Sequence, residues 1–203
     1  MIVGENMLIV LNYEVAFLKR AIIASSHPMS IGPLDYDREI TDDDIARCQK
    51  LGSAKQGSGH DNFLSGVVVS MDVKYPEYWS PEFQRYHFAQ IVSSQSKMHR
   101  ILKFNISEGV NQYVDQDVVD KINAYRYMYN KVDGEDQKYY WFMKIVSNLP
   151  MGFEKIMQIV TNYLQLKTIW YQRHEHKLKE DWQPFCDWIL TLPLFSELTG
   201  IEK

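Results

Sequence analysis

The sequence predicts an α+β fold: a mixed first half of strands and helices around a small antiparallel-type sheet, then a mainly helical second half. Two observations predict the strands of the first half: the short apolar run Met7–Leu11 and the valine-rich run Val67–Val73, both of which are typical of strands. A third observation is that amphipathic patterns with helical spacing dominate from residue 117 onward. A length of 203 residues without an internal repeat predicts a single domain over residues 1–203.

The first half also contains two expected helices. Residues Glu14–Ala24 place apolar side chains on one helical face, with Asn12 as the expected N-cap. The segment Ser25–Asp37 holds two prolines and a glycine and is expected to be a loop. In Thr41–Leu51, a threonine and three aspartates begin the pattern, which favours a capped helix start. An acidic cation site is the alternative hypothesis for these aspartates.

Two further segments carry local signals. Gly52–Asn62 is a flexible Gly/Ser stretch that lacks the terminal Gly-Lys-Ser/Thr of a P-loop and the third glycine of a dinucleotide fingerprint. Ser80 followed by Pro81 predicts a helix start, with Ser80 as the N-cap and Pro81 at the first helical position. We expect this helix to run to about Val92 and to deliver the polar segment that follows it.

The second half contains four segments with helical periodicity: Asp117–Lys131, Glu135–Val146, Met151–His176 and Asp181–Leu192. The third predicts one long helix. Neither a nucleophile elbow nor a zinc motif is visible, since the two histidines of His174-Glu175-His176 do not share a helical face. We therefore expect no metal site and assign no catalytic residue.

Composition limits the classes of partner. A net charge of −4 and a pI near 5.9 argue against general binding to nucleic acid. Cys48 and Cys186 are expected to be buried thiols of a reduced protein, and no apolar run approaches transmembrane length. We expect a cytoplasmic protein with neither nucleic-acid nor membrane partners. Aromatic residues make up 13% of the chain, enough for a large core or for an oligomer interface.

The segment Ser93–Lys103 is the strongest functional signal. It contains two lysines, an arginine, a histidine, three serines and a glutamine, without an acidic residue, in an otherwise acidic chain. Charged donors and directed hydroxyl donors together suit an anion such as a phosphate or nucleotide. The alternative is a solvated polar loop between two buried elements. A second cationic cluster, Arg173–Lys179, either adds to an anion site or stabilises a helix C-terminus.

With these residues in view, the chain resembles the flavin-dependent thymidylate synthases, in order through most of its length. Ser58–Asn62 precedes the Val67–Val73 strand where that family has a Ser-Pro-Phe-Glu-His-type motif. The window Phe88–Arg100 corresponds to the family pattern R-H-R-x-x-S-x-N-E-x-S-x-R, in which Ser93 and Arg100 match.

Several family residues are replaced. Phe88-Ala89-Gln90 stands where the family has Arg-His-Arg, and Leu164 stands where a nucleotide-binding arginine would be. Asn162 and Arg173 keep the two ends of the family's late helix pattern. Each lost hydrogen bond to a charged group is worth about 1.5–3 kcal/mol. The resemblance therefore implies the fold more directly than the reaction.

The resemblance implies specific site residues. The expected flavin ligands are His60, Asp61, Asn62, Ser93, Gln95 and Asn162. The expected nucleotide ligands are Arg85, Gln90, Ser94, Ser96, Arg100 and Arg173.

Three functional hypotheses remain open. The first is a divergent member of this family that binds FAD and a pyrimidine nucleotide between the subunits of a homo-tetramer. If active, it would be a flavin- and folate-dependent methyltransferase acting on deoxyuridylate. The second is a non-enzymatic nucleotide-binding or regulatory module that kept the fold and lost the reaction. The third is a helical small-molecule-binding protein unrelated to the family.

Overall fold

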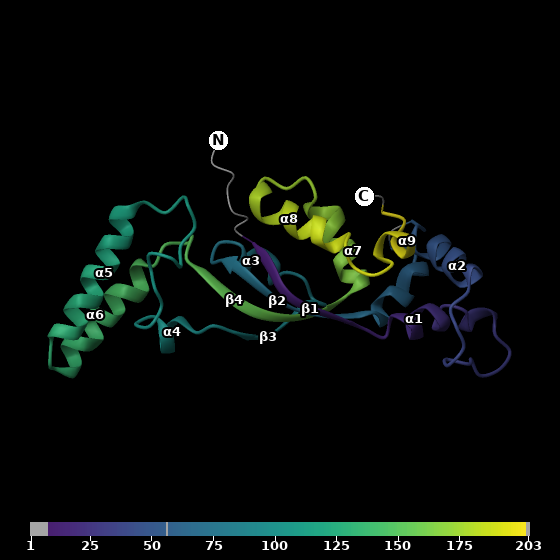
Figure 1. The fold of residues 1–203 in the computed structure, drawn as a ribbon, viewed down its shortest axis with the longest axis horizontal. Coiled ribbons are helices and arrows are strands. Elements are labelled where there is room, and N and C mark those ends of the chain that lie inside the picture. Colours follow the sequence, from purple (N-terminus) through teal and green to yellow (C-terminus); the bar gives the residue numbers. More distant parts are fainter. Residues whose placement is uncertain (1–7, 56, 202–203) are drawn as a thin grey trace.

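Four strands form one antiparallel sheet at the centre of an elongated molecule (Figure 1). The computed structural model describes residues 8–55 and 57–201. The spatial order is β1-β2-β4-β3, so β2 and β4 are central and β1 and β3 lie at the edges. The strands are β1 (Ile9–Ala16), β2 (Val68–Pro76), β3 (Gln90–Ser94) and β4 (Glu154–Asn162).

Helices cover one face of this sheet. Helices α7 (Tyr163–Arg173) and α8 (Lys179–Ile189) lie over it, and α3 (Ser80–Phe83) contributes to the same core (Figure 1). Trp79, beside α3, packs with its ring centroid 4.9 Å from that of Trp182 on α8. Because both indoles are fully buried, this aromatic contact joins the strand-to-helix connection firmly to α8.

Side-chain alternation determines which face of the sheet is covered. In β2, Val69, Met71 and Val73 are buried, whereas Ser70 and Asp72 between them are partly exposed. The buried set belongs to the same hydrophobic cluster as the residues of α7 and α8. Each fully buried apolar side chain of this kind contributes about 1.5–3 kcal/mol. The other face of the sheet carries the more polar side chains.

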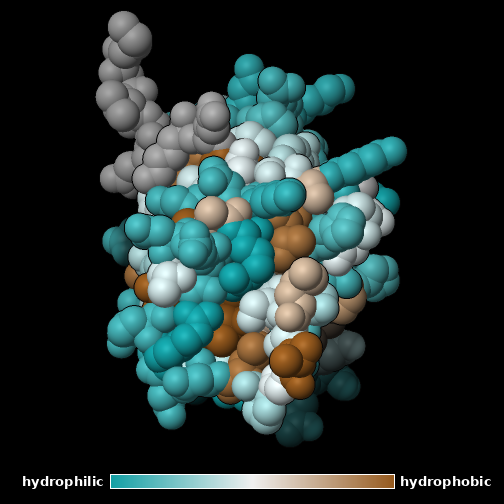
Figure 2. Space-filling view, turned by 90° about the vertical axis from the view of Figure 1, so that its right-hand side faces the viewer, coloured by the Kyte–Doolittle hydropathy of each residue, from teal (hydrophilic) through white to brown (hydrophobic). Residues whose placement is uncertain are grey.

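The two ends of the molecule are helical. At one end, α5 (Gln116–Lys131) and α6 (Glu135–Asn148) form a projecting hairpin with its own small hydrophobic cluster (Figure 1). At the other end lie α1 (Leu18–Ala24), α2 (Asp42–Gly52) and α9 (Phe195–Thr199). Figure 2 faces this second end, whose described surface is mostly hydrophilic with hydrophobic residues in small islands. This view shows no broad apolar patch.

The structure confirms the α+β class and several expected elements. Helix α2 begins after Thr41 with a capping box, in which the Thr41 side chain accepts from the Asp44 amide and the Asp44 carboxylate accepts from the Thr41 amide. Arg38 and Arg47 also bind the Asp44 carboxylate, which lowers the pKa of Asp44 well below its usual range. The alternative hypothesis placed a cation site at these aspartates, but two guanidinium groups already bind the Asp44 carboxylate. No group of three metal-ligating side chains lies together within residues 8–55 and 57–201.

The expected helix over Glu14–Ala24 is wrong in its first turn. Residues 14–16 continue β1, and Asn12 lies inside the strand rather than at a helix cap. Phe17 adopts a left-handed conformation (φ 63°) between the strand and α1. Pairing with β2 therefore outweighs the local helical spacing. The strand predicted over Met7–Leu11 is confirmed from Ile9 onward, and Met7 lies outside the described residues.

The helix expected from Ser80 to Val92 is also wrong in extent. Helix α3 ends at Phe83, and Ser80 is its first residue rather than its N-cap. Residues 90–94 form β3 instead, which pairs with β4 over Gln90↔Val160 to Ser94↔Met157. The polar segment therefore begins on an edge strand and not at a helix C-terminus.

The long helix expected over Met151–His176 is two elements. Its first part is β4, which pairs with β2 on one side and β3 on the other, and only residues 163–173 are helical, as α7. Alternate residues Met157, Ile159 and Thr161 are buried, as a strand with one covered face requires. The second half is therefore less helical than expected. Among the described residues, no helix is long and apolar enough to cross a membrane.

Candidate functional site

Most of the expected site residues lie along β3 or in two cavities at its ends. The first, here the α7 groove, lies between η2 (His60–Gly66), the residues before β3, and α7. It consists of two adjoining spaces of about 430 and 410 Å³ that share His87, Gln165 and Thr168. The second, here the α4 cavity, has about 330 Å³ and lies where β3 leads into α4 (Lys97–Arg100).

Glycines and an exposed aromatic ring shape one part of the α7 groove. Gly57 and Gly59 have φ values of 82° and 77°, a conformation that favours glycine, and both line the groove. The Phe88 backbone is fixed, since its amide donates to Gln165 Oε1 (3.2 Å) and its carbonyl accepts from Thr161 Oγ1 (2.9 Å). Its ring is nevertheless 68% exposed. The groove thus presents an exposed apolar ring whose backbone is held by two hydrogen bonds.

A buried ion pair forms the wall of the groove. Lys167 Nζ donates to Asp61 Oδ2 and to the Gly52 carbonyl, each at 2.6 Å. Both side chains are almost fully buried, with 4% and 6% exposed. The pair joins η2 to α7, so the Asp61 carboxylate is bound to the protein itself rather than directed at a ligand. Asn62, the next residue, is exposed and lines the groove.

Arg173 is also held by neighbours within the protomer. Its Nε donates to the Tyr86 hydroxyl (2.7 Å) and its Nη1 pairs with Glu82 (2.9 Å). The guanidinium also lies 4.6 Å from the centroid of the Trp182 ring. Burial raises the pKa of Tyr86, which keeps its hydroxyl neutral. Arg173 therefore anchors α7 to α3 and α8 as well as lining the groove.

Three further expected ligands make local backbone contacts. The Asn162 side chain accepts from the Gln165 amide (2.9 Å) and caps α7. Gln95 Oε1 accepts from the Ile156 amide (3.0 Å), and Ser96 Oγ accepts from the His99 amide (3.3 Å) to cap α4. Of the remaining predicted residues, His60 is exposed outside the groove lining, and Gln90, Ser93 and Ser94 are exposed on edge strand β3.

The α4 cavity is positively charged. Its lining combines Gln95, Ser96, Arg100, Lys103 and Phe104, and contains no carboxylate. Lys97, which the sequence grouped with these cations, instead pairs with Glu77 at 3.2 Å. The cationic groups left for a ligand are therefore Arg100 and Lys103.

The pairing of arginines singles out two positions. The chain has seven arginines, all within the described residues. Arg85 and Arg100 have no ion pair, side-chain hydrogen bond or ring contact with the described part of the chain, and each lines a cavity at one end of β3. The other five have partners: Arg38 and Arg47 bind Asp44, Arg173 binds Glu82, Arg126 donates to the Leu102 carbonyl, and Arg20 lies over the Tyr36 ring.

The two cavities remain separate within one protomer. From Gln90 to Gln95 the extended chain covers roughly 17 Å at 3.3 Å per residue. The structure therefore places Arg85 and Arg100 at opposite ends of β3 rather than in one pocket.

Sequence analysis missed three residues at the centre of the α7 groove: His87, Gln165 and Thr168. The first fell inside the helix expected to reach Val92, and the other two inside the long helix expected over Met151–His176. Asn162 was the available signal, because an asparagine before a helical pattern is a favoured N-cap.

Comparison with known proteins adds the fold to this geometry. No protein-family model matches the chain, and no curated protein matches it by sequence. Solved structures do match, and the fold is that of the flavin-dependent thymidylate synthases.

Three of these structures illustrate the likeness. Thymidylate synthase X (ThyX) from Helicobacter pylori, solved with FAD and dUMP, has a TM-score of 0.65 at 15% identity, with 95% of each chain covered. A second structure of that enzyme, also with FAD and dUMP, has a TM-score of 0.62 at 15% identity, covering 95% of this chain and 96% of the other. The UMP/dUMP methylase PolB from Streptomyces cacaoi, bound with 5-Br dUMP, has a TM-score of 0.64 at 10% identity, covering 97% and 95%.

The α7 groove fits one part of a flavin better than another. The exposed Phe88 ring, the open glycines and the Asn62 amide suit a flat ring with polar edges. A diphosphate would find fewer partners, since Lys167 and Arg173 are paired with carboxylates, which leaves Arg85 and His87 among the described residues that line the groove. The lining of the groove is thus better suited to a flat ring than to phosphate groups.

Proposed function

We propose that this protein binds a pyrimidine nucleotide and a flavin, as a divergent relative of the flavin-dependent thymidylate synthases. One observation carries the proposal: the two arginines without partners among residues 8–55 and 57–201 lie in the two cavities at the ends of β3. A guanidinium that is always charged and has free donors is well suited to bidentate contact with phosphate. Likeness over the whole chain to proteins solved with FAD and dUMP supports a nucleotide as the carrier of that phosphate.

In this proposal Arg100 is the main phosphate anchor. Lys103 adds charge from the same cavity, and the exposed hydroxyls of Ser93 and Ser94 add directed hydrogen bonds from β3. The Ser96 hydroxyl and the Gln95 oxygen already accept backbone amides, so they position the cavity wall. These backbone contacts fix the orientation of the Ser96 hydroxyl and of the Gln95 side-chain amide, whose N–H and O–H groups can still donate to a ligand.

The flavin belongs to the α7 groove. Phe88 would lie against its ring and Asn62 would bond to a ring edge, whereas Arg85 in the adjoining space would contact the phosphate of a nucleotide. A bound flavin would supply hydride chemistry, and the family reaction would be flavin- and folate-dependent methylation of deoxyuridylate. Loss of the Arg-His-Arg motif predicts weaker flavin binding than the family motif would give.

A second copy of the chain completes the site in this proposal. The two arginine cavities lie too far apart on one protomer for a single nucleotide, and by resemblance the assembly is a homo-tetramer with sites between subunits. The sheet face opposite α7 and α8 and the free edge of β3 are the available surfaces. Light scattering that shows a monomer at micromolar concentration would contradict shared sites.

A non-enzymatic binding module is the second candidate, and one observation favours it. Asp61, Asn162 and Arg173, three residues expected to bind ligands, are occupied by contacts within the protomer. In this version the cavities still bind a nucleotide, but no flavin is held.

Fluorescence titration with FAD separates the two candidates. Saturable binding that weakens at least tenfold in Phe88→Ala supports the flavin site, with Phe17→Ala, at an exposed ring that does not line the groove, as the matched control. Absence of FAD binding at millimolar concentration, together with measurable dUMP binding, favours the module. Absence of both ligands contradicts the proposal.

A further inference from the structure

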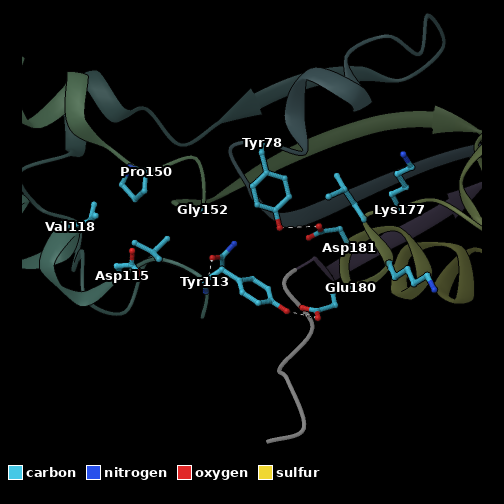
Figure 3. Close-up of a pocket in the computed structure, with 13 residues that line it drawn as sticks. Tyr78, Tyr113, Asp115, Val118, Pro150, Gly152, Lys177, Glu180 and Asp181 are labelled. Atoms are coloured by element: carbon cyan, nitrogen blue, oxygen red, sulfur yellow. Dashed lines mark hydrogen bonds between the residues drawn. The ribbon is translucent and has the colours of Figure 1, made fainter.

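A third cavity, here the α8 cavity, lies outside both arginine cavities. It has a volume of about 690 Å³ and separates the start of α8 from the base of the α5–α6 hairpin (Figure 3). Its walls come from the connection after β2, the residues before α5, the residues before β4 and the first turn of α8. None of its lining residues lines the α7 groove or the α4 cavity.

A buried carboxylate with an unused oxygen lines this cavity. Asp181 is 1% exposed, and its Oδ2 accepts a hydrogen bond from the Tyr78 hydroxyl at 3.0 Å. Its Oδ1 is buried and has no hydrogen-bond partner among residues 8–55 and 57–201. An acid in the first turn of a helix complements the helix dipole, but that role leaves the orphaned oxygen unexplained. A buried acceptor without a donor is costly, which indicates a missing partner.

The electrostatic surroundings of Asp181 favour a positively charged partner. Burial, followed by the nearby charges of Glu180, Glu154 and Glu82, raises the pKa of Asp181 to about 6, against the hydrogen bond from Tyr78. Glu154 and Glu82 are paired with Lys74 and Arg173, whereas Glu180 accepts from the Tyr113 hydroxyl at 2.6 Å at the cavity mouth.

The remaining charged groups of the cavity do not neutralise Asp181. Lys177 and Lys179 line it but form no ion pair with a described carboxylate, and Asp115 adds a further negative charge. Figure 3 shows the Lys177 ammonium directed away from Tyr78 and Asp181. A donor brought by a ligand is therefore the missing partner that these charges favour.

The other walls suit an apolar ligand body. Val114, Val118, Pro150 and Leu178 supply aliphatic surface, and the rings of Tyr78 and Tyr113 are directed toward Asp181 and Glu180 (Figure 3). Flat aromatic walls beside carboxylates are typical of sites for cations with an apolar body. No third metal-ligating side chain joins the carboxylates among the described residues, which disfavours a bare metal ion.

We propose that the α8 cavity is a binding site for a small organic cation, a protonated amine or an amidinium on a flat apolar body, whose N–H group donates to Asp181 Oδ1. The site does not depend on the nucleotide or flavin proposed above. It lies at the joint between the central sheet and the α5–α6 hairpin, so a bound cation would contact both.

Benzamidine is a suitable probe, with neutral benzamide as its shape-matched counterpart. Isothermal titration of the full chain at pH 8 should show benzamidine binding at least tenfold more tightly than benzamide. Asp181→Asn should abolish this preference, whereas Asp187→Asn, the same change on the exposed side of α8, should leave it intact. The preference should shrink at pH 5, as Asp181 takes up a proton.

Two results would overturn the proposal. One is equal affinity of the wild-type protein for benzamidine and benzamide at pH 8, including binding of neither. The other is a folded Asp181→Asn variant that keeps the preference for benzamidine. If near-ultraviolet circular dichroism shows that Asp181→Asn does not fold, the wild-type preference at pH 8 and at pH 5 decides. A preference that does not change with pH would then contradict the role of Asp181.

Discussion

Asp181→Asn should stabilise the protein at neutral pH and leave it unchanged in acid. Burial raises the pKa of Asp181 from 3.8 to about 6 in the folded state, so the folded protein binds this proton more tightly than the unfolded chain does. The contribution of Asp181 to stability is therefore fully present below about pH 4 and is lost as the pH rises through 6. A shift of about two units corresponds to about 3 kcal/mol at most, at 1.36 kcal/mol per unit.

The asparagine variant does not ionise, and its amide oxygen can still accept from the Tyr78 hydroxyl. Urea unfolding at pH 4 should give the same free energy for both proteins, and at pH 7.5 the variant should be more stable by up to about 3 kcal/mol. Asp187→Asn, at an exposed position on the same helix, should show no such pH-dependent difference. If the free energies of unfolding of Asp181→Asn and wild type differ by the same amount from pH 4 to 7.5, burial does not raise the pKa of Asp181 as inferred.

Three further results follow from the structure. Lys167→Met should lower the free energy of unfolding by about 3–5 kcal/mol, because it leaves the buried Asp61 carboxylate unpaired, and adding Asp61→Asn should recover part of this loss in urea unfolding. Gly59→Ala should cost about 1–2 kcal/mol because its φ is 77°, whereas Gly32→Ala should change stability by less than about 0.5 kcal/mol in the same assay. Arg100→Lys keeps the charge but loses bidentate geometry, so dUMP affinity should fall at least fivefold by calorimetry, and an unchanged affinity would remove Arg100 from the anchor role.

Elements with strong local signals were predictable from the sequence. The capping residues of Thr41–Leu51 specify the start of α2 without help from the rest of the chain. The valine-rich run of β2 and the helix pair α5 and α6 have a single dominant periodicity each. In all of these, local propensity and tertiary contacts favour the same structure.

The failures occur where a distant strand determines the conformation. Residues 154–162 satisfy helical spacing, yet β2 and β3 pair with them on both sides. Residues 90–94 follow a helix start, yet they complete the sheet edge beside β4. Neither pairing leaves a signal in its own segment, because the paired residue lies 63–94 positions away in sequence, from Ser94↔Met157 to Val68↔Asn162.

The site was predictable in its residue types more than in its geometry. Arg100 and Arg85 were expected ligands, and neither has a partner in the part of the chain that the structure describes. Arg173 and Asp61 were expected ligands too, but Glu82 and Lys167 bind them. Only three-dimensional packing reveals which charges are paired. Asp181 could not be identified from the sequence for the same reason. An acidic residue in the first turn of a helix usually faces solvent and interacts favourably with the helix dipole.

Calorimetric titration with dUMP tests the proposed nucleotide site in wild type, Arg85→Ala, Arg100→Ala and Arg20→Ala. Arg20 lies over the Tyr36 ring and lines neither cavity, so Arg20→Ala is the matched control that removes one guanidinium elsewhere. We expect saturable binding to wild type, a Kd at least tenfold higher in Arg85→Ala and Arg100→Ala, about 1.4 kcal/mol each, and no change in Arg20→Ala. A wild-type protein without measurable dUMP affinity, or an Arg100→Ala variant that binds like wild type, would contradict it.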